Sequence, residues 1–326
     1  MSAAGAAGRS NTRDTVTVGP VNVVAAYEKF QYLRLVQLGG KARRARAAGL
    51  SLNIMDIPGA GSGPPLLLVH GFSGSAASQY ATLVRHLQSR FRRIVAPDLP
   101  GHGFSEVPPS GLTDAHLVAG LRAAIDYVGE PSIIFASSMG GGVAVRCAAR
   151  EPERVRGLIL CSPAGGPLKP DDVEQLNRLF HIRSHRDALR FVDALFPRRR
   201  RLRHVYALGV AHQFKRPHLF GFLRSAAHMK LLTPGELESL RMPILLIWGR
   251  RDHILPTRQW AFFRAHLPAH AYIERPQSFG HAPFLDHPWA VSERIRRFVA
   301  SLDGTDGQFA PFATQPAVAG SASGDT

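Results

Sequence analysis

Residues 133–142, with the sequence IIFASSMGGG, decide the fold of this chain. Four apolar residues followed by a run of mainly small ones are typical of a short buried strand that turns sharply into a helix. A serine at such a turn has a strained backbone, and the residues two before and two after it must be small. Ala136 and Gly140 meet that condition, so the stretch predicts that Ser138 stands exposed at the turn.

Short apolar runs alternate with helical patterns on both sides of this turn. Because strands that alternate with helices build parallel sheets, the pattern predicts an α/β fold with a mostly parallel, doubly wound sheet. The expected strands are residues 52–57, 66–69, 94–96, 133–136, 157–161, 244–248 and 271–273. The expected helices are residues 79–89, 114–128, 143–150, 258–266 and 289–302.

The alternation is interrupted between the strands at 157–161 and 244–248, where the pattern is mainly helical. The sequence therefore predicts a helical cap inserted into an α/β core. The expected parts are an N-terminal arm and helix (1–49), the core (50–162 and 241–302), the cap (163–240) and a disordered tail (303–326).

Two titratable side chains follow the last two expected strands. Asp252 comes just after the strand at 244–248, and His281 lies on the loop after the final one. Loops at the carboxyl ends of parallel strands form the binding site of such a sheet. A serine hydroxyl needs a nearby base, and a carboxylate orients that base. We therefore expect Ser138 as nucleophile, His281 as base and Asp252 as the acid. His253 is the alternative base, although its side chain is expected to point away from its neighbour Asp252.

Stabilisation of a developing oxyanion is expected from two backbone N–H groups. The strand at 66–69 leads into HGFSG at 70–74, which places the N–H of Phe72 near that of Met139 at the start of a helix. Loss of one such donor typically lowers the rate by about 10²–10³. His70 is expected to shape the loop by hydrogen bonding, and DLPGHGFS at 98–105 is expected to be a structural turn.

Five motifs occur in one order along the chain. They are HGF at 70–72, DLPGHGFS at 98–105, SSMGG at 137–141, WGRRD at 248–252 and GHAPF at 280–284. With these motifs in this order, the sequence resembles the α/β-hydrolase superfamily over about residues 52–302. The resemblance implies an α/β-hydrolase fold with a helical cap. Ala136 departs from the usual G-x-S-x-G pattern of the serine turn. SPAGG at 162–166 looks similar to bacterial lipases and monoacylglycerol-lipase-like members, whereas SSMGG also resembles carbon–carbon bond hydrolases.

The resemblance and the apolar cap predict a serine esterase or lipase that cleaves carboxylic esters with an apolar acyl or aromatic group. The leucine and phenylalanine side chains of the cap either line that pocket or form the cap's own core. One alternative is a hydrolase of carbon–carbon bonds in ring-fission diketones, with cap arginines holding a carboxylate. Another is a binding protein that keeps the fold without turnover.

The chain carries 40 lysine and arginine residues against 24 aspartate and glutamate residues, a net charge of +16. Such an excess is compatible with nucleic acid, an anionic membrane surface or simple solubility. No nucleic-acid recognition motif or aromatic stacking platform accompanies the arginines, so no nucleic-acid partner is expected. The densest basic run, RRRRLRH at 198–204, fits anionic lipid, a substrate carboxylate or a solvated surface.

Residues 21–38 form an expected N-terminal helix with apolar side chains along one face. These side chains are Val23, Tyr27, Phe30, Leu33 and Leu38. The cations that follow are Lys41, Arg43, Arg44 and Arg46. A helix lying on an anionic membrane and a helix packed on the core both fit this pattern. Packing is favoured because Arg34 and Gln37 interrupt the apolar face.

The sequence gives little information about the protein's cellular compartment or its cofactors. No apolar run reaches the roughly 18–20 residues that span a bilayer, and no signal peptide is evident, so a cytoplasmic protein, soluble or membrane-peripheral, is expected. Cys147 and Cys161 lie in apolar runs and are expected to be buried thiols. The histidines show no metal-ligand spacing, so neither a metal nor a cofactor is expected.

Overall fold

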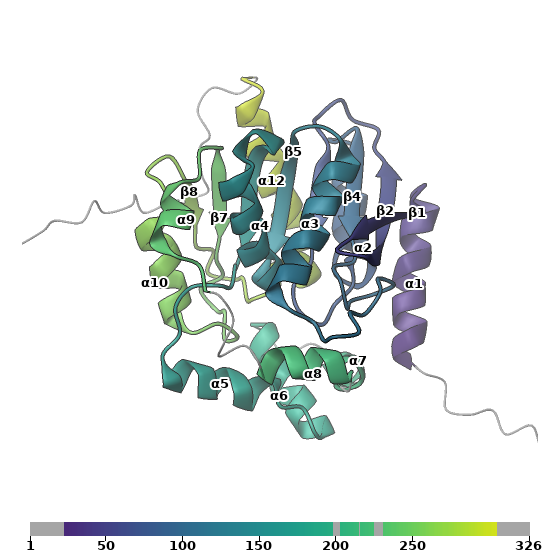
Figure 1. Ribbon diagram of the computed structural model, residues 1–326, viewed down its shortest axis with the longest axis vertical. Coiled ribbons are helices and arrows are strands. Elements are labelled where there is room, and N and C mark those ends of the chain that lie inside the picture. The colour runs from purple at the N-terminus through teal and green to yellow at the C-terminus, as the bar shows by residue number, and fades with distance from the viewer. Residues whose placement is uncertain (1–22, 198–202, 215, 225–230, 305–326) are drawn as a thin grey trace, which may run out of the picture.

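The computed structural model describes residues 23–197, 203–214, 216–224 and 231–304. Its centre is an eight-stranded sheet with the strand order β1-β2-β4-β3-β5-β6-β7-β8 (Figure 1). The strands are β1 (Lys41–Ala47), β2 (Leu50–Pro58), β3 (Leu66–Val69), β4 (Arg93–Pro97), β5 (Ser132–Ser137), β6 (Val155–Cys161), β7 (Ile244–Ile247) and β8 (Tyr272–Glu274).

Helices cover both faces of this sheet. The core helices are α1 (Val23–Gln37), α2 (Ala76–Leu87), α3 (Asp114–Val128), α4 (Ser138–Arg150), α10 (Thr257–His266), α11 (Pro283–Asp286) and α12 (Pro288–Leu302), with a short 3₁₀ turn at Pro152–Arg154. One apolar cluster joins the sheet to α3, α4 and α10, and a second joins it to α1, α2, α11 and α12. Strands β3, β5 and β7 are buried along their whole length, as expected of strands covered on both faces.

The sheet is parallel from β4 to β8 and antiparallel where β2 meets β1 and β4. This confirms the mostly parallel, doubly wound α/β fold. Cys147 in α4 and Cys161 in β6 are both buried free thiols, as the sequence predicted.

Strand β1 corrects the expected start of the core at residue 50. Its sequence KARRARA pairs antiparallel with β2, with Lys41 opposite Asp56 and Ala47 opposite Leu50. The strand lies at the edge of the sheet and its side chains are mostly exposed, so it has no apolar pattern by which to recognise it. Charges on an edge strand discourage pairing with another chain.

Helix α1 packs on the core, but through a different face from the one the sequence indicated. Gln31 and Leu35 are buried, and Nη1 of Arg34 donates to Oγ1 of Thr82 in α2 at 3.0 Å. Phe30 and Leu33, which were expected on the packed face, are exposed. The apolar pattern was misleading because hydrogen-bonded polar side chains occupy part of the contact with α2.

A helical insertion, here residues 163–240, separates β6 from β7. Its helices are α5 (Pro170–Phe180), α6 (His185–Leu195), α7 (Arg203–Gln213), α8 (Pro217–Arg224) and α9 (Pro234–Glu238). Helices α5 to α8 lie beyond the carboxyl ends of the strands (Figure 1), and α6 and α7 share a small apolar core around Val192 and Ala207.

Several expected features lie outside the described residues. They are the N-terminal arm over residues 1–22, the arginine run at 198–201 and the tail beyond residue 304. Within the described part of the chain, no helix is long and apolar enough to cross a membrane.

Candidate active site

Ser138 lies at the sharp turn from β5 into α4. Its φ angle is +49°, in the left-handed region that a residue with a side chain rarely adopts. A Cβ atom built on Gly140 would lie 2.4 Å from the carbonyl oxygen of His70, so a larger residue there would force the backbone to shift. The strained turn and the small residue after it are both as the sequence predicted.

His281 and Asp252 meet beside this turn. Nδ1 of His281 lies 2.9 Å from Oδ2 of Asp252, and the two side chains are only 7% and 2% exposed. The backbone N–H groups of Ile254 and Leu255 donate to Oδ1 of Asp252 at 2.9 and 3.1 Å. His253 is exposed and takes no part in this contact, as expected.

The surroundings of Asp252 keep its carboxylate ionised. Burial by itself raises the pKa of Asp252, but the neighbouring His281 and the donated hydrogen bonds outweigh it, so the pKa lies below its ordinary value. An ionised carboxylate at Nδ1 fixes the proton on that nitrogen. Nε2 of His281 is then the nitrogen that can accept a proton.

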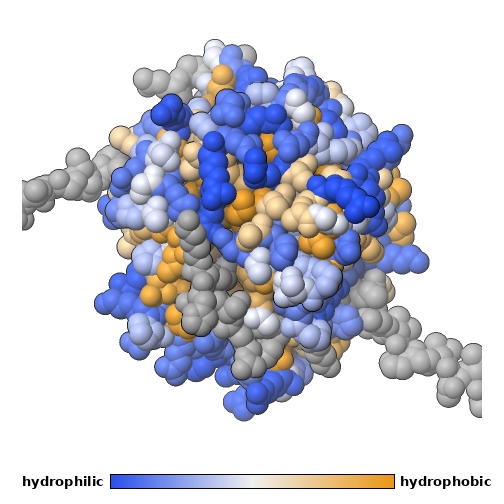
Figure 2. Space-filling model, viewed as in Figure 1, coloured by the Kyte–Doolittle hydropathy of each residue, from blue (hydrophilic) through white to orange (hydrophobic). Residues whose placement is uncertain are grey.

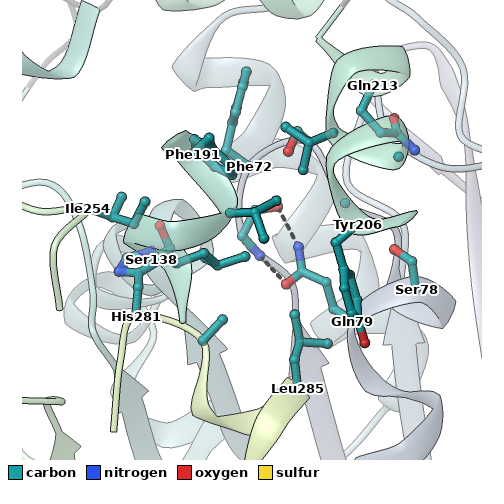
Figure 3. A pocket seen from close by; sticks show the side chains of 18 of the residues that line it. Phe72, Ser78, Gln79, Ser138, Phe191, Tyr206, Gln213, Ile254, His281 and Leu285 are labelled. Carbon is teal, nitrogen blue, oxygen red and sulfur yellow. Dashed lines mark hydrogen bonds between the residues drawn. The ribbon is translucent and has the colours of Figure 1, made fainter. Parts of the chain in front are cut away.

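Ser138 and His281 both line a cavity of about 290 Å³ (Figure 3). We call it the first cavity. Its wall is mainly apolar, with Phe191 from α6, Val210 from α7 and Leu285 from α11. Most binding sites for small molecules are such apolar hollows with a few polar groups.

A second cavity, of about 160 Å³, also reaches Ser138. Phe72 and Phe180 line both cavities, so the two hollows meet near the serine. The insertion supplies much of both walls. Its apolar lining residues are Leu168, Val173, Leu176, Phe180, Phe191, Val192, Leu195, Phe196, Val205, Val210, Phe222, Leu223, Leu231 and Leu232.

The loop after β3 is held next to Ser138 by hydrogen bonds. The N–H of Gly71 donates to Oε1 of Gln79 at 3.0 Å, and Nε2 of Gln79 donates to the Gly71 carbonyl at 3.4 Å (Figure 3). A Cβ atom on Gly71 would lie 3.1 Å from Cβ of Ser138, so the loop passes close to the turn. This places Phe72 beside the start of α4, where Met139 has a backbone N–H without an intrahelical acceptor.

His70 and Asp98 have the structural roles that the sequence predicted. Nε2 of His70 accepts from the N–H of Leu99 at 2.9 Å, which leaves Nδ1 to donate to the Gly71 carbonyl at 2.8 Å. Complete burial is the main reason that the pKa of His70 is lowered, which keeps this bridge neutral. The carboxylate of Asp98 accepts from the N–H groups of Ala76 and Phe104.

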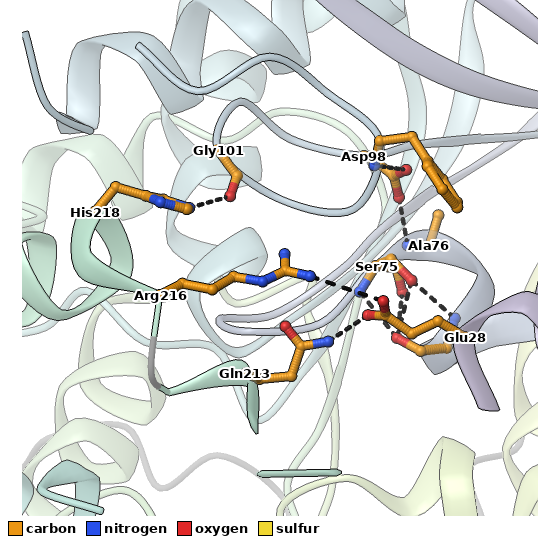
Figure 4. Close-up of polar contacts among 10 residues, drawn as sticks. Glu28, Ser75, Ala76, Asp98, Gly101, Gln213, Arg216 and His218 are labelled. Carbon is orange, nitrogen blue, oxygen red and sulfur yellow. Dashed lines mark hydrogen bonds and ion pairs between the residues drawn. The ribbon is translucent and has the colours of Figure 1, made fainter. Parts of the chain in front are cut away.

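Three side chains of the site were missed by sequence reasoning. Gln79 holds the loop after β3, and Tyr27 and Glu28 of α1 line the first cavity. Glu28 accepts a hydrogen bond from Nε2 of Gln213, and its Oε2 lies 3.7 Å from Nη2 of Arg216 (Figure 4). Of these three, only Gln79 could have been identified from the sequence, because it lies five residues after the HGFSG motif.

Two curated relatives are similar to most of the chain. Pimeloyl-[acyl-carrier protein] methyl ester esterase of Xanthomonas campestris pv. campestris is 32% identical over 266 residues, 76% of this chain and 100% of that protein. 2-Hydroxymuconate semialdehyde hydrolase of Pseudomonas sp. (strain CF600) is 27% identical over 292 residues, 80% of this chain and 94% of that protein.

The fold is shared with solved structures. The crystal structure of a membrane phospholipase A superposes with a TM-score of 0.72 at 23% identity and covers 86% of this chain and 92% of that one. The sequence model of the α/β hydrolase fold matches residues 64–216. Together with the identity to the methyl ester esterase, these similarities show that the chain belongs to the α/β-hydrolase family.

Proposed function

We propose that the protein is a serine hydrolase that cleaves carboxylic esters through an acyl-enzyme. The observation that carries this is the buried contact of His281 with Asp252, at the wall of a cavity that Ser138 also lines. Serine hydrolases that act through a catalytic triad use this combination of nucleophile, base and orienting carboxylate. The strained backbone of Ser138 and the adjoining apolar cavities support the same assignment.

The proposed reaction runs in two halves. Nε2 of His281 takes the proton of Ser138 while Oγ attacks the acyl carbonyl carbon, and the backbone N–H groups of Phe72 and Met139 hold the oxyanion. His281 then gives its proton to the leaving alcohol. A water molecule, deprotonated by His281, attacks the acyl-enzyme, and Ser138 recovers its proton as the acid leaves.

The walls of the cavities favour an apolar acyl or aromatic group. Most side chains that line them are aliphatic or aromatic, and Arg146 is the cation among them within the described residues. That cation already contacts Asp114 and lies 3.6 Å from Glu236. The site therefore gives less support to carbon–carbon bond cleavage with an arginine-held carboxylate, although one relative at 27% identity is a 2-hydroxymuconate semialdehyde hydrolase.

The test is hydrolysis of p-nitrophenyl esters from acetate to palmitate, with Ser138→Ala as the control. We expect turnover to peak at a middle or long chain and to fall by at least about 10³-fold in the variant. Full turnover by Ser138→Ala would overturn the proposal. Protein that is labelled at Ser138 by a fluorophosphonate but cleaves no ester would favour the carbon–carbon alternative. Folded protein that neither reacts nor is labelled would favour a binding protein.

A further inference from the structure

Helix α1 carries an exposed apolar stripe on the side away from the core. Phe30, Leu33 and Val36 are 58%, 46% and 42% exposed, and their spacing of three residues places them along one face. Hydrophobic residues reach the surface at the right-hand margin of Figure 2, where α1 lies in Figure 1. Three large apolar side chains in one exposed row make this face of α1 a candidate binding surface.

The stripe continues onto the neighbouring loop and edge strand. The ring of Tyr32 in α1 packs edge-on against Phe104, which is itself half exposed, with centroids 5.3 Å apart. Nη1 of Arg44 in β1 donates to the carbonyl of Phe104 at 2.8 Å. Helix α1, the Phe104 loop and β1 therefore form one continuous surface, which we call the α1 surface.

The charges around the α1 surface are mainly positive. Lys29 of α1 and Arg44 and Arg46 of β1 are exposed, and among the described residues no ion pair joins them to a carboxylate. Glu106 is the acidic neighbour, since its carboxylate accepts from the N–H of Ser51, which is opposite Arg46 in the sheet. An apolar face bordered by cations is complementary to anionic lipid headgroups above an acyl layer.

The same helix forms part of the wall of the first cavity. Tyr27 and Glu28 line that cavity, and Glu28 contacts Gln213, the last residue of α7, and Arg216, which directly precedes α8 (Figure 4). On α7, the half-exposed side chain of Val205 also lines the cavity. Helix α1 therefore connects the α1 surface to the wall of the first cavity.

We propose that the α1 surface docks on an anionic lipid bilayer, and that the acyl ester substrate enters the first cavity from that bilayer beside α1. The substrate part rests on the proposed ester hydrolase function, whereas the docking part stands on the α1 surface alone. A second copy of the chain is a poorer occupant because it would bring like charges together. The first 22 residues are also poorly suited to bind the α1 surface, because they contain no leucine, isoleucine or aromatic residue.

The experiment is sedimentation of the full-length protein with vesicles of phosphatidylcholine alone, or of phosphatidylcholine and phosphatidylglycerol in equal amounts. The wild type is expected to bind the anionic vesicles, and Phe30→Ser/Leu33→Ser to bind them at least tenfold more weakly. Trp289→Ser is the matched control, because Trp289 is 63% exposed at the start of α12, outside the α1 surface. Lys29→Glu/Arg46→Glu should also weaken binding, and added salt should weaken binding of the wild type.

Hydrolysis of a short soluble ester separates the two proposals. It should be the same in the wild type and the α1 variants, because their substituted side chains line neither cavity. Equal vesicle binding by the wild type and both double variants would overturn the docking proposal, as would equal binding to neutral and anionic vesicles. A dimer in solution that Phe30→Ser/Leu33→Ser converts to a monomer, without vesicle binding by either, would assign the surface to a second copy instead.

Discussion

Nδ1 of His281 lies 2.9 Å from Oδ2 of Asp252, although the two residues are 29 positions apart and follow different strands. The other oxygen of the carboxylate is fixed by the N–H groups of Ile254 and Leu255. The imidazole is therefore held by a carboxylate that cannot turn without losing these bonds.

Asp252→Asn is expected to lower kcat by about 10⁴-fold while the fold is retained. The Asn side chain can still accept from the N–H groups of Ile254 and Leu255, but its amide group donates to Nδ1 of His281 and stabilises the wrong tautomer. Ester turnover and circular dichroism check this. Asp126→Asn is the control, since that exposed aspartate pairs with Arg154 on the surface. Turnover by Asp252→Asn within tenfold of the wild type would contradict the assigned role.

Gln79→Glu is expected to lower kcat by roughly ten- to a hundredfold with KM nearly unchanged. The substitution removes the donor to the Gly71 carbonyl and places a negative charge next to the developing oxyanion. The loss should stay below the about 10²–10³ typical of removing an oxyanion donor, because the N–H of Phe72 remains. Gln88→Glu serves for comparison, since Gln88 also donates to backbone carbonyls but lies outside both cavities. An equal effect of the two substitutions would show that Gln79 has only a structural role.

Gly140→Ala is expected to destabilise the protein by about 1–3 kcal/mol, the usual cost of overpacking. The added methyl group would lie 2.4 Å from the His70 carbonyl oxygen and 2.9 Å from that of Val69. Gly235→Ala in α9 is the matched control, because nothing lies within 4 Å of the added carbon. Urea denaturation of both variants measures the difference. Equal stability of the two would mean that α4 can shift away from β3 at little cost.

Asp56→Asn tests the ion pair between Asp56 of β2 and Arg93 of β4. Burial raises the pKa of Asp56, but hydrogen bonds from Arg93 and Tyr127 outweigh it, so the folded-state pKa lies below the ordinary value. Such a group stabilises the fold above its unfolded pKa of about 3.9, and that contribution is lost as the pH falls through the lower folded value.

The wild type should therefore be more stable than Asp56→Asn at neutral pH, and the difference should shrink as the pH falls below about 4. Urea midpoints at several pH values check this prediction. A difference that stays constant with pH would show that Asp56 stabilises the fold by packing and not by its charge.

The central part of the fold could be predicted because its signals are local. Ser138, Asp252 and His281 each follow a short apolar strand, and the carboxyl ends of neighbouring parallel strands meet at one edge of the sheet. The charged strand β1 gave no such signal, because an edge strand is recognised by its partner and not by its own composition.

The rest depends on which surfaces meet in three dimensions. The apolar pattern of α1 could not show that Gln31 and Leu35 face the core while Phe30 and Leu33 face outward. Glu28 likewise lines the first cavity because α1 lies beside α7, and no local sequence pattern specifies that contact between the two helices.

Labelling with a fluorophosphonate probe, followed by peptide mass spectrometry, tests the central claim that Ser138 is the nucleophile. The account predicts one adduct, on Ser138, that is absent from Ser138→Ala. The adduct should remain in Ser137→Ala, because the neighbouring hydroxyl is buried and hydrogen-bonded to Tyr80. Labelling of a different serine, or no labelling of protein that is folded, would contradict the claim.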